Sequence, residues 1–383
     1  MSNNHQKDTS QNNISSQQLP TDEPLGVLEP VAYFHGAMPT GVTVSQHGRI
    51  FVNFPKWGDD VQFTVAEIKN GKTIAYPDES FNRTDPHDPA KALVSVQSVV
   101  VDPIDRLWIL DTGSPLFQPT EYGGPKIVCV DLTKDQVIKK ILFPQDVALP
   151  TTYLNDIRFD LRRGKEGMAF ITDSSQKGPN GIIIVDLASG ESWRHLHDHP
   201  STKPEELQNF LPIVEGRPFL EQQPDGSVKQ GAGMGSDGIA ISSDGSRLYY
   251  CPLGSRKLYS VDTGTLVDRT SDNRKVADTV VNEGDRGGAA DGLESDATGY
   301  IYSTNYEHNS ILRRHPDIRI WETIVHDQRL LWPDTLSVAL DGYLYVTANQ
   351  LHRQARYQKG HDLRRKPYTL FRIRIDASPV LLR

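Results

Sequence analysis

The sequence predicts an all-β protein that folds as a six-bladed β-propeller. Two observations lead to this fold class. Long amphipathic helices are missing, and six segments align without a gap over nine residues. These segments are Thr40–Gly48, Gln97–Asp105, Asn155–Arg163, Asp237–Gly245, Asp291–Gly299 and Asp334–Gly342. Strand–turn–strand units that recur at such intervals are typical of propeller blades.

Each repeat is followed by apolar runs that we expect to form its second and third strands. The second strand follows the shared turn, as in Arg106–Ile109, and the third follows a longer loop, as in Lys126–Asp131 and Gly181–Asp186. The inner strand Ser98–Val101 does not alternate strictly between apolar and polar residues. This pattern fits a propeller, because neighbouring blades bury both faces of each sheet.

The ends of the chain and one long interval differ from the repeats. Residues 1–24 are rich in Asn, Gln and Ser and predict a disordered tail, so residues 25–383 form the single expected domain. The segment 195–235 is an insertion between the third and fourth repeats, expected over one face of the propeller. Its stretch Pro204–Phe210 is the one helix-like patch. We expect Tyr368–Asp376 to close the ring against the N-terminal segment.

The composition excludes some classes of partner. With 41 Lys and Arg against 49 Asp and Glu, the formal charge is −8, which argues against a nucleic-acid or anionic membrane surface. No apolar run is long enough to span a bilayer, and the start does not read as a signal peptide. We therefore expect a cytoplasmic monomer. Cys129 and Cys251 belong to no metal-binding spacing; we expect two buried free thiols and leave a disulfide open.

The first residue of each repeat forms a polar column that should face the central channel. Its members are Thr40, Gln97, Asn155, Asp237, Asp291 and Asp334, and Asp156 lies beside Asn155. Crowded carboxylates repel unless a cation neutralises them. Oxygen ligands suit Ca²⁺ best, and Mg²⁺ or Mn²⁺ next. The alternative is that these residues only cap turns, as Asp-Gly pairs often do.

A second metal hypothesis concerns three alternating histidines, His195, His197 and His199. On a strand they would share one face, where Zn²⁺ could bind. They lie in a proline-containing insertion, which favours ordinary loop histidines.

Five stretches resemble the major royal jelly protein/yellow family: Leu93–Gly113, Leu154–Asp160, Ala169–Asp173, Asp237–Leu253 and, like the bacterial branch of that family, Leu331–Arg353. The resemblance implies a six-bladed propeller. Members of the family are often exported, so the resemblance implies secretion as the alternative to a cytoplasmic location.

The column is more distantly similar to the metal site of gluconolactonase/senescence-marker-type and paraoxonase-type propellers. In those proteins matching positions hold Ca²⁺ or another divalent ion, which makes Asn155, Asp237 and Asp291 the implied ligands. The hydrolases also use a first-blade glutamate, whereas the first repeat here opens with Thr40 and Gly41. Asp334 is the residue that could compensate.

Two classes of function remain open. The first is a metal-assisted hydrolase of a small lactone or ester, with Asp334 or Asp156 as general base. The second is a protein that binds an aromatic amine or catechol, or a dopachrome-converting tautomerase of the yellow type. In either class, substrate contacts are expected from polar and aromatic residues near strand ends, namely Gln97, Trp57, Tyr153, Tyr306 and Trp332.

Overall fold

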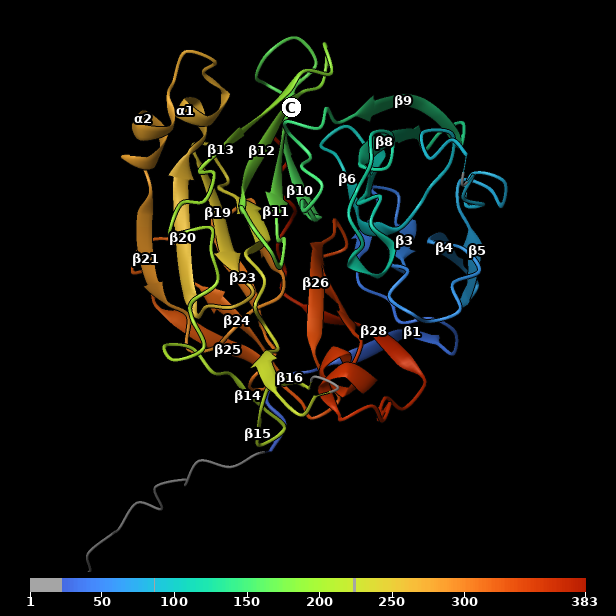
Figure 1. Ribbon diagram of the computed structural model, residues 1–383, viewed down its shortest axis with the longest axis vertical. Coiled ribbons are helices and arrows are strands. Elements are labelled where there is room, and N and C mark those ends of the chain that lie inside the picture. The colour runs from blue at the N-terminus through green and yellow to red at the C-terminus, as the bar shows by residue number, and fades with distance from the viewer. Residues whose placement is uncertain (1–22, 86, 223–224) are drawn as a thin grey trace, which may run out of the picture.

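The computed structural model describes residues 23–85, 87–222 and 225–383. Within these residues the strands form six four-stranded antiparallel sheets and two short hairpins. Figure 1 shows the six sheets arranged around a common centre, which confirms the six-bladed propeller. The predicted tail 1–24 lies outside the described residues except for its last two positions.

The first five blades each run in sequence order from the innermost strand to the outermost. The first two contain β2 (Val42–Val44), β3 (Ile50–Asn53), β4 (Val65–Lys69) and β5 (Lys72–Ala75), then β6 (Val96–Val101), β7 (Arg106–Asp111), β8 (Lys126–Asp131) and β9 (Gln136–Leu142). The third contains β10 (Leu154–Asp160), β11 (Met168–Asp173), β12 (Gly181–Asp186) and β13 (Ser192–His195). The next two contain β18 (Ser236–Ile241), β19 (Arg247–Pro252), β20 (Lys257–Asp262) and β21 (Val281–Asp285), then β22 (Leu293–Ser295), β23 (Ile301–Asn305), β24 (Ser310–Arg314) and β25 (Trp321–His326).

The sixth blade joins the two ends of the chain. Its order is β26 (Pro333–Val338), β27 (Tyr343–Ala348), β28 (Tyr368–Arg374) and then β1 (Glu29–Phe34). β1 pairs antiparallel with β28, and Phe34 lies opposite Tyr368. The expected closure of the ring by the C-terminal strand is therefore present, and it leaves no open seam of unpaired backbone groups in the ring.

The apolar core lies between the blades. Between the second and third blades, Trp108 and Ile127 pack in one cluster with Ile157 and Ile171, and all four side chains are almost fully buried. Further clusters fill the spaces between the other neighbouring sheets. Because every sheet is covered on both faces, runs such as the one in β12 are apolar throughout instead of alternating.

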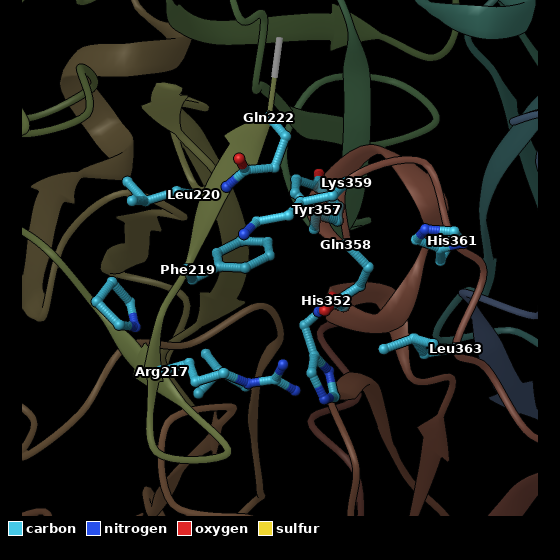
Figure 2. A pocket seen from close by; sticks show the side chains of 12 residues that line it. Arg217, Phe219, Leu220, Gln222, His352, Tyr357, Gln358, Lys359, His361 and Leu363 are labelled. Carbon is cyan, nitrogen blue, oxygen red and sulfur yellow. The ribbon is translucent and has the colours of Figure 1, made fainter. Parts of the chain in front are cut away.

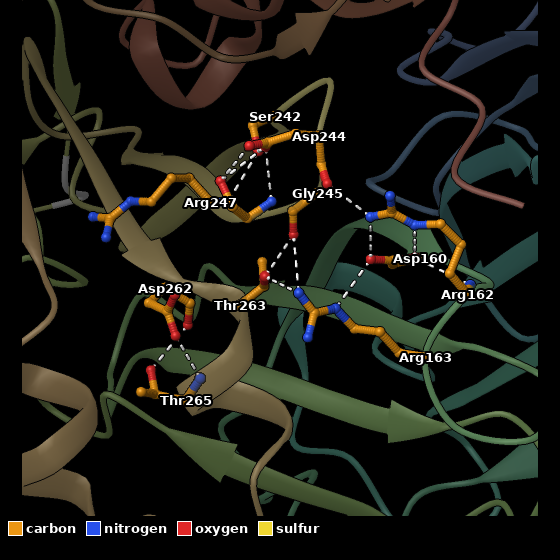
Figure 3. Close-up of polar contacts among 11 residues, drawn as sticks. Asp160, Arg162, Arg163, Ser242, Asp244, Gly245, Arg247, Asp262, Thr263 and Thr265 are labelled. Carbon is orange, nitrogen blue, oxygen red and sulfur yellow. Dashed lines mark hydrogen bonds and ion pairs between the residues drawn. The ribbon is translucent and has the colours of Figure 1, made fainter.

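Polar contacts between turns also hold neighbouring blades together, as Figure 3 shows for the third and fourth blades. Arg162, after β10, donates to the carbonyl oxygen of Asp244 at 2.8 Å. Arg163 donates to Thr263 Oγ1 at 2.9 Å, and both arginines contact the carboxylate of Asp160. The turn after one inner strand is thereby tied to the turn of the next blade.

Among its described residues, 195–222 and 225–235, the insertion forms no blade of its own and no helix. It contains two hairpins, β14 (Ile213–Val214) with β15 (Arg217–Pro218) and β16 (Leu220–Gln222) with β17 (Val228–Gln230). The helix-like reading of Pro204–Phe210 is wrong, because this stretch forms a turn in which Phe210 N–H bonds to the carbonyl of Glu206.

The short helices lie instead in the fourth blade, between β20 and β21, as α1 (Thr263–Val267) and α2 (Asn273–Ala277). The side chains of Asp262 and Asp272 cap their N-termini. Neither helix is long enough to show the apolar periodicity by which a sequence reveals a helix.

Cys129 and Cys251 are buried free thiols, as expected, and lie in different blades. Among the described residues, no helix has the length and apolar character needed to cross a membrane.

Candidate functional site

Most residues that the sequence places in the axial column lie at β-bulges. The pairing register shifts in the innermost strands of four blades, in the gaps Val96–Ser98, Leu154–Ile157, Ser236–Ile239 and Pro333–Leu336. These gaps contain Gln97, Asn155, Asp156, Asp237 and Asp334. A bulge takes a residue out of the regular ladder and changes where its side chain points, and bulges often occur next to functional sites.

Threonines on the second strands hold the backbone at these irregular points. In the third blade, Thr172 Oγ1 donates to the carbonyl oxygen of Asp237 at 2.7 Å, and so reaches the next blade. In the fifth blade, Thr304 Oγ1 lies 3.0 Å from the backbone N–H groups of Asp291 and Gly292 and accepts from them. The backbone of the column is therefore positioned by buried side-chain hydrogen bonds.

The glycine after the aspartate lets adjacent blades approach closely at the axis. A Cβ on Gly238 would lie 2.6 Å from the carbonyl oxygen of Asp291, and one on Gly292 would lie 2.3 Å from that of Asp334. Real Cβ atoms do not make such short contacts with backbone oxygens. The Asp-Gly pairs therefore bring successive aspartates of the fourth, fifth and sixth blades together.

Asn155, Asp237 and Asp291 form a connected group at the centre. Asn155 Nδ2 donates to Asp237 Oδ1 at 2.6 Å. Asp237 and Asp291 share a hydrogen bond between their carboxyl groups. The structure thus brings together the three residues that the sequence assigns as metal ligands, and their exposed fractions are only 8%, 3% and 8%.

The electrostatics of these acids are unusual. Burial, with the charge of Asp291 next, raises the pKa of Asp237 well above its ordinary range. Burial raises the pKa of Asp291 to about 6, although hydrogen bonds from Trp332 and Asp237 oppose the shift. The hydrogen bond between the two carboxyl groups raises the pKa of Asp237 and lowers that of Asp291. Two buried carboxylates in contact cannot both ionise without a compensating cation.

Asp334 lies close to this pair but makes its own contacts. Asn349 Nδ2 donates to its Oδ2 at 2.7 Å, and Thr335 Oγ1 lies 3.1 Å from its Oδ1. Burial, together with the charge of Asp291, raises the pKa of Asp334 well above the usual value. Three acids from three blades therefore share one buried, acidic region.

Asp156 belongs to a different group. Its Oδ2 pairs with Arg158 at 2.9 Å, and its Oδ1 accepts from Ser98 Oγ at 2.7 Å. Arg158 also donates to the carbonyl oxygen of Leu293 at 2.8 Å and lies 3.3 Å from Glu294. This arginine links the third and fifth blades and already neutralises Asp156.

Gln97, Tyr153 and Trp57 form a second cluster on the side of the first two blades. Trp57 Nε1 donates to Tyr153 OH at 2.8 Å, and Tyr153 OH donates to Gln97 Oε1 at 3.1 Å. Thr40 supplies no acid here: its Oγ1 accepts from Asn53 and donates to the backbone carbonyl of Gln97 at 3.2 Å. This side of the centre is rich in hydroxyl and amide groups and contains none of the three acids.

Tyr306 and Trp332 form the other aromatic pair. Their rings stack with centroids 4.1 Å apart and an interplanar angle of 8°. Trp332 also contacts Phe219 of the insertion, at 4.9 Å between centroids, and His352, at 5.8 Å. Both Tyr306 and Trp332 are fully buried. Trp332 donates a hydrogen bond to Asp291 on one side and contacts the insertion on the other, so it lies between the insertion and the acids.

The three alternating histidines are not brought together. β13 ends at His195, and left-handed backbone at Leu196 and Asp198 prevents the strand from continuing. His195 Nδ1 lies 3.2 Å from Asn273 Oδ1, whereas His199 Nδ1 lies 2.8 Å from Ser201 Oγ. These local partners agree with loop histidines.

Within the described ranges, no group of three or more His, Cys, Asp and Glu side chains lies close enough to hold a metal ion. The donor chemistry of the centre still fits a hard cation. Asp237, Asp291 and Asp334 are buried oxygen donors with raised pKa values, and none forms an ion pair with a described basic side chain. If the side-chain amide of Asn155 rotated so that its Oδ1 faced the acids, it would add a further oxygen donor to the three carboxyl groups.

Other acids in the family-like stretches have structural roles. Asp111 accepts backbone N–H groups of the loop before β6 and pairs with Lys126 Nζ at 2.8 Å, with both side chains fully buried. Asp173 repeats this arrangement with Arg194, also at 2.8 Å. The similarity of these stretches therefore reflects the construction of the blades and says little about chemistry.

Sequence reasoning missed the residues that support the acids. Asn349, Thr304 and Thr172 lie at or just after the ends of second strands, where a Thr or Asn that recurs in most repeats was a usable signal. Phe219 and His352 carried no such signal, because they approach the centre from loops far away in the sequence.

Solved structures with a similar fold extend over almost the whole chain. Regucalcin from Agrobacterium tumefaciens, described as a calcium-binding protein, has a TM-score of 0.55 at 12% identity, covering 92% of this chain and 98% of its own. A putative gluconolactonase has a TM-score of 0.54 at 10% identity, covering 93% of this chain and 96% of its own. At these identities the likeness shows the fold alone.

Sequence relatives are closer. Major royal jelly protein 1 of Apis mellifera is 29% identical over 239 residues, which cover 59% of this chain and 50% of the relative. Protein yellow of Drosophila erecta is 29% identical over 250 residues, which cover 61% and 42%. The chain thus spans about half the length of the curated relatives it matches. The major royal jelly protein family model matches residues 94–377, and the chain therefore belongs to the major royal jelly protein family.

Proposed function

We propose that this protein is a cation-dependent hydrolase of a small lactone or ester. The observation that carries the proposal is the group of three buried acids, Asp237, Asp291 and Asp334, that lack a basic partner among the described residues. A buried negative group of this kind requires a cation or bound protons. Regucalcin, which has a similar fold, is described as a calcium-binding protein, and this supports a bound cation in preference to bound protons.

In this proposal Asn155, Asp237 and Asp291 hold the cation. A bound Ca²⁺ would polarise the substrate carbonyl and lower the pKa of a water molecule. Asp334 accepts the proton of that water, and Asn349 and Thr335 keep its carboxylate oriented through their hydrogen bonds.

We assign the base to Asp334 in preference to Asp156. The carboxylate of Asp156 is already occupied by Arg158 and Ser98. Proton uptake by Asp156 would break this ion pair and leave the buried guanidinium of Arg158 without it. Asp334 forms no ion pair with a described basic side chain, and burial, together with the charge of Asp291, raises its pKa.

Substrate contacts are proposed on the side of the centre that contains none of the three acids. The amide of Gln97 and the hydroxyl of Tyr153 suit the hydroxyl groups of a sugar-like lactone, and Trp57 offers a partly exposed ring. Entry requires the insertion to move, because Phe219 and Trp332 cover the acids.

The test is a panel of γ- and δ-lactones and short esters, assayed with Ca²⁺ and with excess chelator. We expect hydrolysis that chelator abolishes and that Asp334→Asn lowers at least about hundredfold, the usual contribution of a general base. Asp317→Asn, which changes an exposed turn acid, is the matched control and should keep full activity. Hydrolysis that survives both chelator and Asp334→Asn would contradict the mechanism.

A second candidate function is the binding of an aromatic amine. It is favoured by one observation: the carboxylate of Asp291 lies against the indole of Trp332, which stacks on Tyr306. A carboxylate beside stacked rings suits an ammonium group attached to an aromatic ring. Saturable binding of tryptamine that Ca²⁺ displaces, without turnover of any lactone, would favour this function over hydrolysis.

We also propose that residues 25–383 fold as one domain and act as a monomer. Removal of residues 1–24 should leave the unfolding transition unchanged, and light scattering should give the mass of one chain. Insoluble protein after this trimming would argue against it.

A further inference from the structure

A pocket of about 560 Å³ lies beyond the acidic centre, between the insertion and the loop that follows β27 (Figure 2). Arg217 and Phe219 come from the hairpins of the insertion. His352 and Tyr357 lie in two short 3-10 turns, Leu351–Arg353 and Ala355–Tyr357, and Lys359 follows them. Segments about 140 residues apart in the chain therefore form its two walls.

The polar lining of this pocket is basic. Arg217 and Lys359 line it, and neither forms an ion pair or side-chain hydrogen bond with any described residue. No Asp or Glu is among its lining residues. Glu221 lies in β16 between two residues that line the pocket, does not line it itself, and is paired in register with Lys229. After burial, its charge helps to raise the pKa of Tyr357, so this acid acts electrostatically on a residue that lines the pocket. This local positive charge is notable in a chain with net charge −8.

The floor of the pocket is aromatic. The ring centroids of Phe219 and Tyr357 lie 4.5 Å apart, and Cζ of Arg356 lies 4.6 Å from the centroid of the Tyr357 ring. Aromatic rings next to unpaired cations suit a flat apolar ligand that carries a negative charge.

An unpartnered buried atom also points to a ligand. His352 is 2% exposed, and its Nε2 lies 2.6 Å from Glu215 Oε2. Its Nδ1 is buried and has no hydrogen-bond partner. Figure 2 shows the His352 ring and the Arg217 side chain pointing toward each other across the pocket. Burial lowers the pKa of His352, and the charges of Arg353 and Arg217 act in the same direction against Glu215, which favours the neutral ring.

We propose that this pocket binds an aromatic carboxylate. The carboxylate would lie between Arg217 and Lys359, and the ring would pack on Phe219 and Tyr357. Charge-assisted hydrogen bonds of this kind are the strong ones in proteins. Because Nε2 of His352 donates to Glu215, its free Nδ1 is an acceptor, which would take a hydrogen bond from a polar N–H or O–H of the ligand ring.

This site is separate from the acidic centre. Phe219 lines the pocket and its ring also contacts Trp332, which in turn bonds to Asp291. An anion is repelled by the three acids and attracted by the basic pocket, so the two sites prefer opposite charges. The proposal therefore does not depend on the hydrolase.

The test compares three probes of the same shape by isothermal titration calorimetry on the full chain at pH 7.5. Indole-3-acetate carries the carboxylate, indole-3-acetamide is its neutral counterpart, and tryptamine is cationic. We expect indole-3-acetate to bind at least tenfold more tightly than the amide, and tryptamine not to bind at this pocket. The double variant Arg217→Gln/Lys359→Gln should weaken binding of indole-3-acetate by tenfold or more.

Lys229→Gln removes an exposed cation of the same hairpins that does not line the pocket, and it should leave the affinity unchanged. Asp237→Asn should also leave it unchanged, which separates this site from the proposed catalytic one. A thermal melt of each variant establishes that it is folded. The proposal is overturned if acid and amide bind equally well, if the double variant binds as the wild type does, or if indole-3-acetate shows no saturable binding below about 1 mM.

Discussion

Nε1 of Trp332 donates a hydrogen bond to Oδ2 of Asp291 at 2.6 Å, while the same indole stacks on Tyr306 and touches Phe219 of the insertion. One side chain thus connects the cover of the propeller to the acids at its centre. Because the bond favours the ionised form of Asp291, it also lowers the pKa of that carboxyl against the effect of burial.

Replacing Trp332 by Phe keeps an aromatic ring but deletes this hydrogen bond. The pKa of Asp291 should then rise above about 6, so the variant loses more stability as the pH increases through that value. We expect a loss of about 1–3 kcal/mol at pH 8 and a smaller loss at pH 5, where Asp291 is protonated in both proteins. Urea unfolding at the two pH values measures the difference.

Trp193→Phe is the matched control, because Trp193 Nε1 donates to the backbone carbonyl of Leu266 at 3.0 Å, an acceptor that does not titrate. Its effect should be the same at both pH values. If Trp332→Phe were equally insensitive to pH, the bond to an ionising Asp291 would be ruled out.

Removal of a bound cation should lower the melting temperature. A ligand that binds only the native state at a hundredfold excess over its Kd contributes about 2.7 kcal/mol, which is a shift of a few degrees for a chain of this size. Differential scanning calorimetry in chelator and then in added Ca²⁺ should show the loss and its recovery. Asp291→Asn should weaken this response by deleting a charged ligand.

The same substitution behaves differently if no cation binds. Asp291→Asn then removes a charge that repels Asp237 and Asp334, and the variant should be as stable as the wild type or more stable. If chelator has no effect on the melting temperature and Asp291→Asn is more stable than the wild type, the proposed hydrolase loses its basis. The three acids would then be turn-capping residues or part of a site that binds an amine.

Gly292→Ala should disturb the contact between the fifth and sixth blades. The new Cβ would lie 2.3 Å from the carbonyl oxygen of Asp334, so the backbone must shift at the centre of the ring. We expect a destabilisation of about 1–3 kcal/mol, as for other overpacked sites, and a reduced response to Ca²⁺. Gly36→Ala, with open space around its Cβ, should change the stability by less than about 0.5 kcal/mol in the same urea titration.

Lys126→Met should be strongly destabilising, by about 3–5 kcal/mol, because it leaves the fully buried carboxylate of Asp111 without its positive partner. Lys134→Met breaks an exposed pair with Asp131 and should cost less than about 1 kcal/mol. Chemical denaturation of the two variants provides the comparison, and equal effects would show that burial does not set the strength of the Lys126 pair.

The sequence was sufficient to predict the repeats, the second and third strands and the closure by β28, because each depends on local patterns. Apolar runs and turn residues mark a strand wherever it lies in the fold. The polar column was visible for the same reason, since Asp237 and Asp291 recur at one position of the repeat. The helix-like reading of Pro204–Phe210 failed because so short a pattern does not distinguish a helix from a turn.

Pairwise relations between distant residues were not predictable in this way. Asp334 and Asp156 were equivalent candidates for the base, and only the folded chain shows that Arg158 occupies Asp156. The contact of Phe219 with Trp332, and the pocket shared by Arg217 and Lys359, likewise join a loop insertion to residues more than a hundred positions away.

By itself the sequence determined the architecture and the set of acids that face the channel, because hydrophobic periodicity and turn chemistry are local properties of a chain. Only the tertiary structure decided which acids lack a counter-charge, what covers them and where a basic pocket forms. Those properties depend on burial and on distances between side chains, which arise when blades and loops pack against one another.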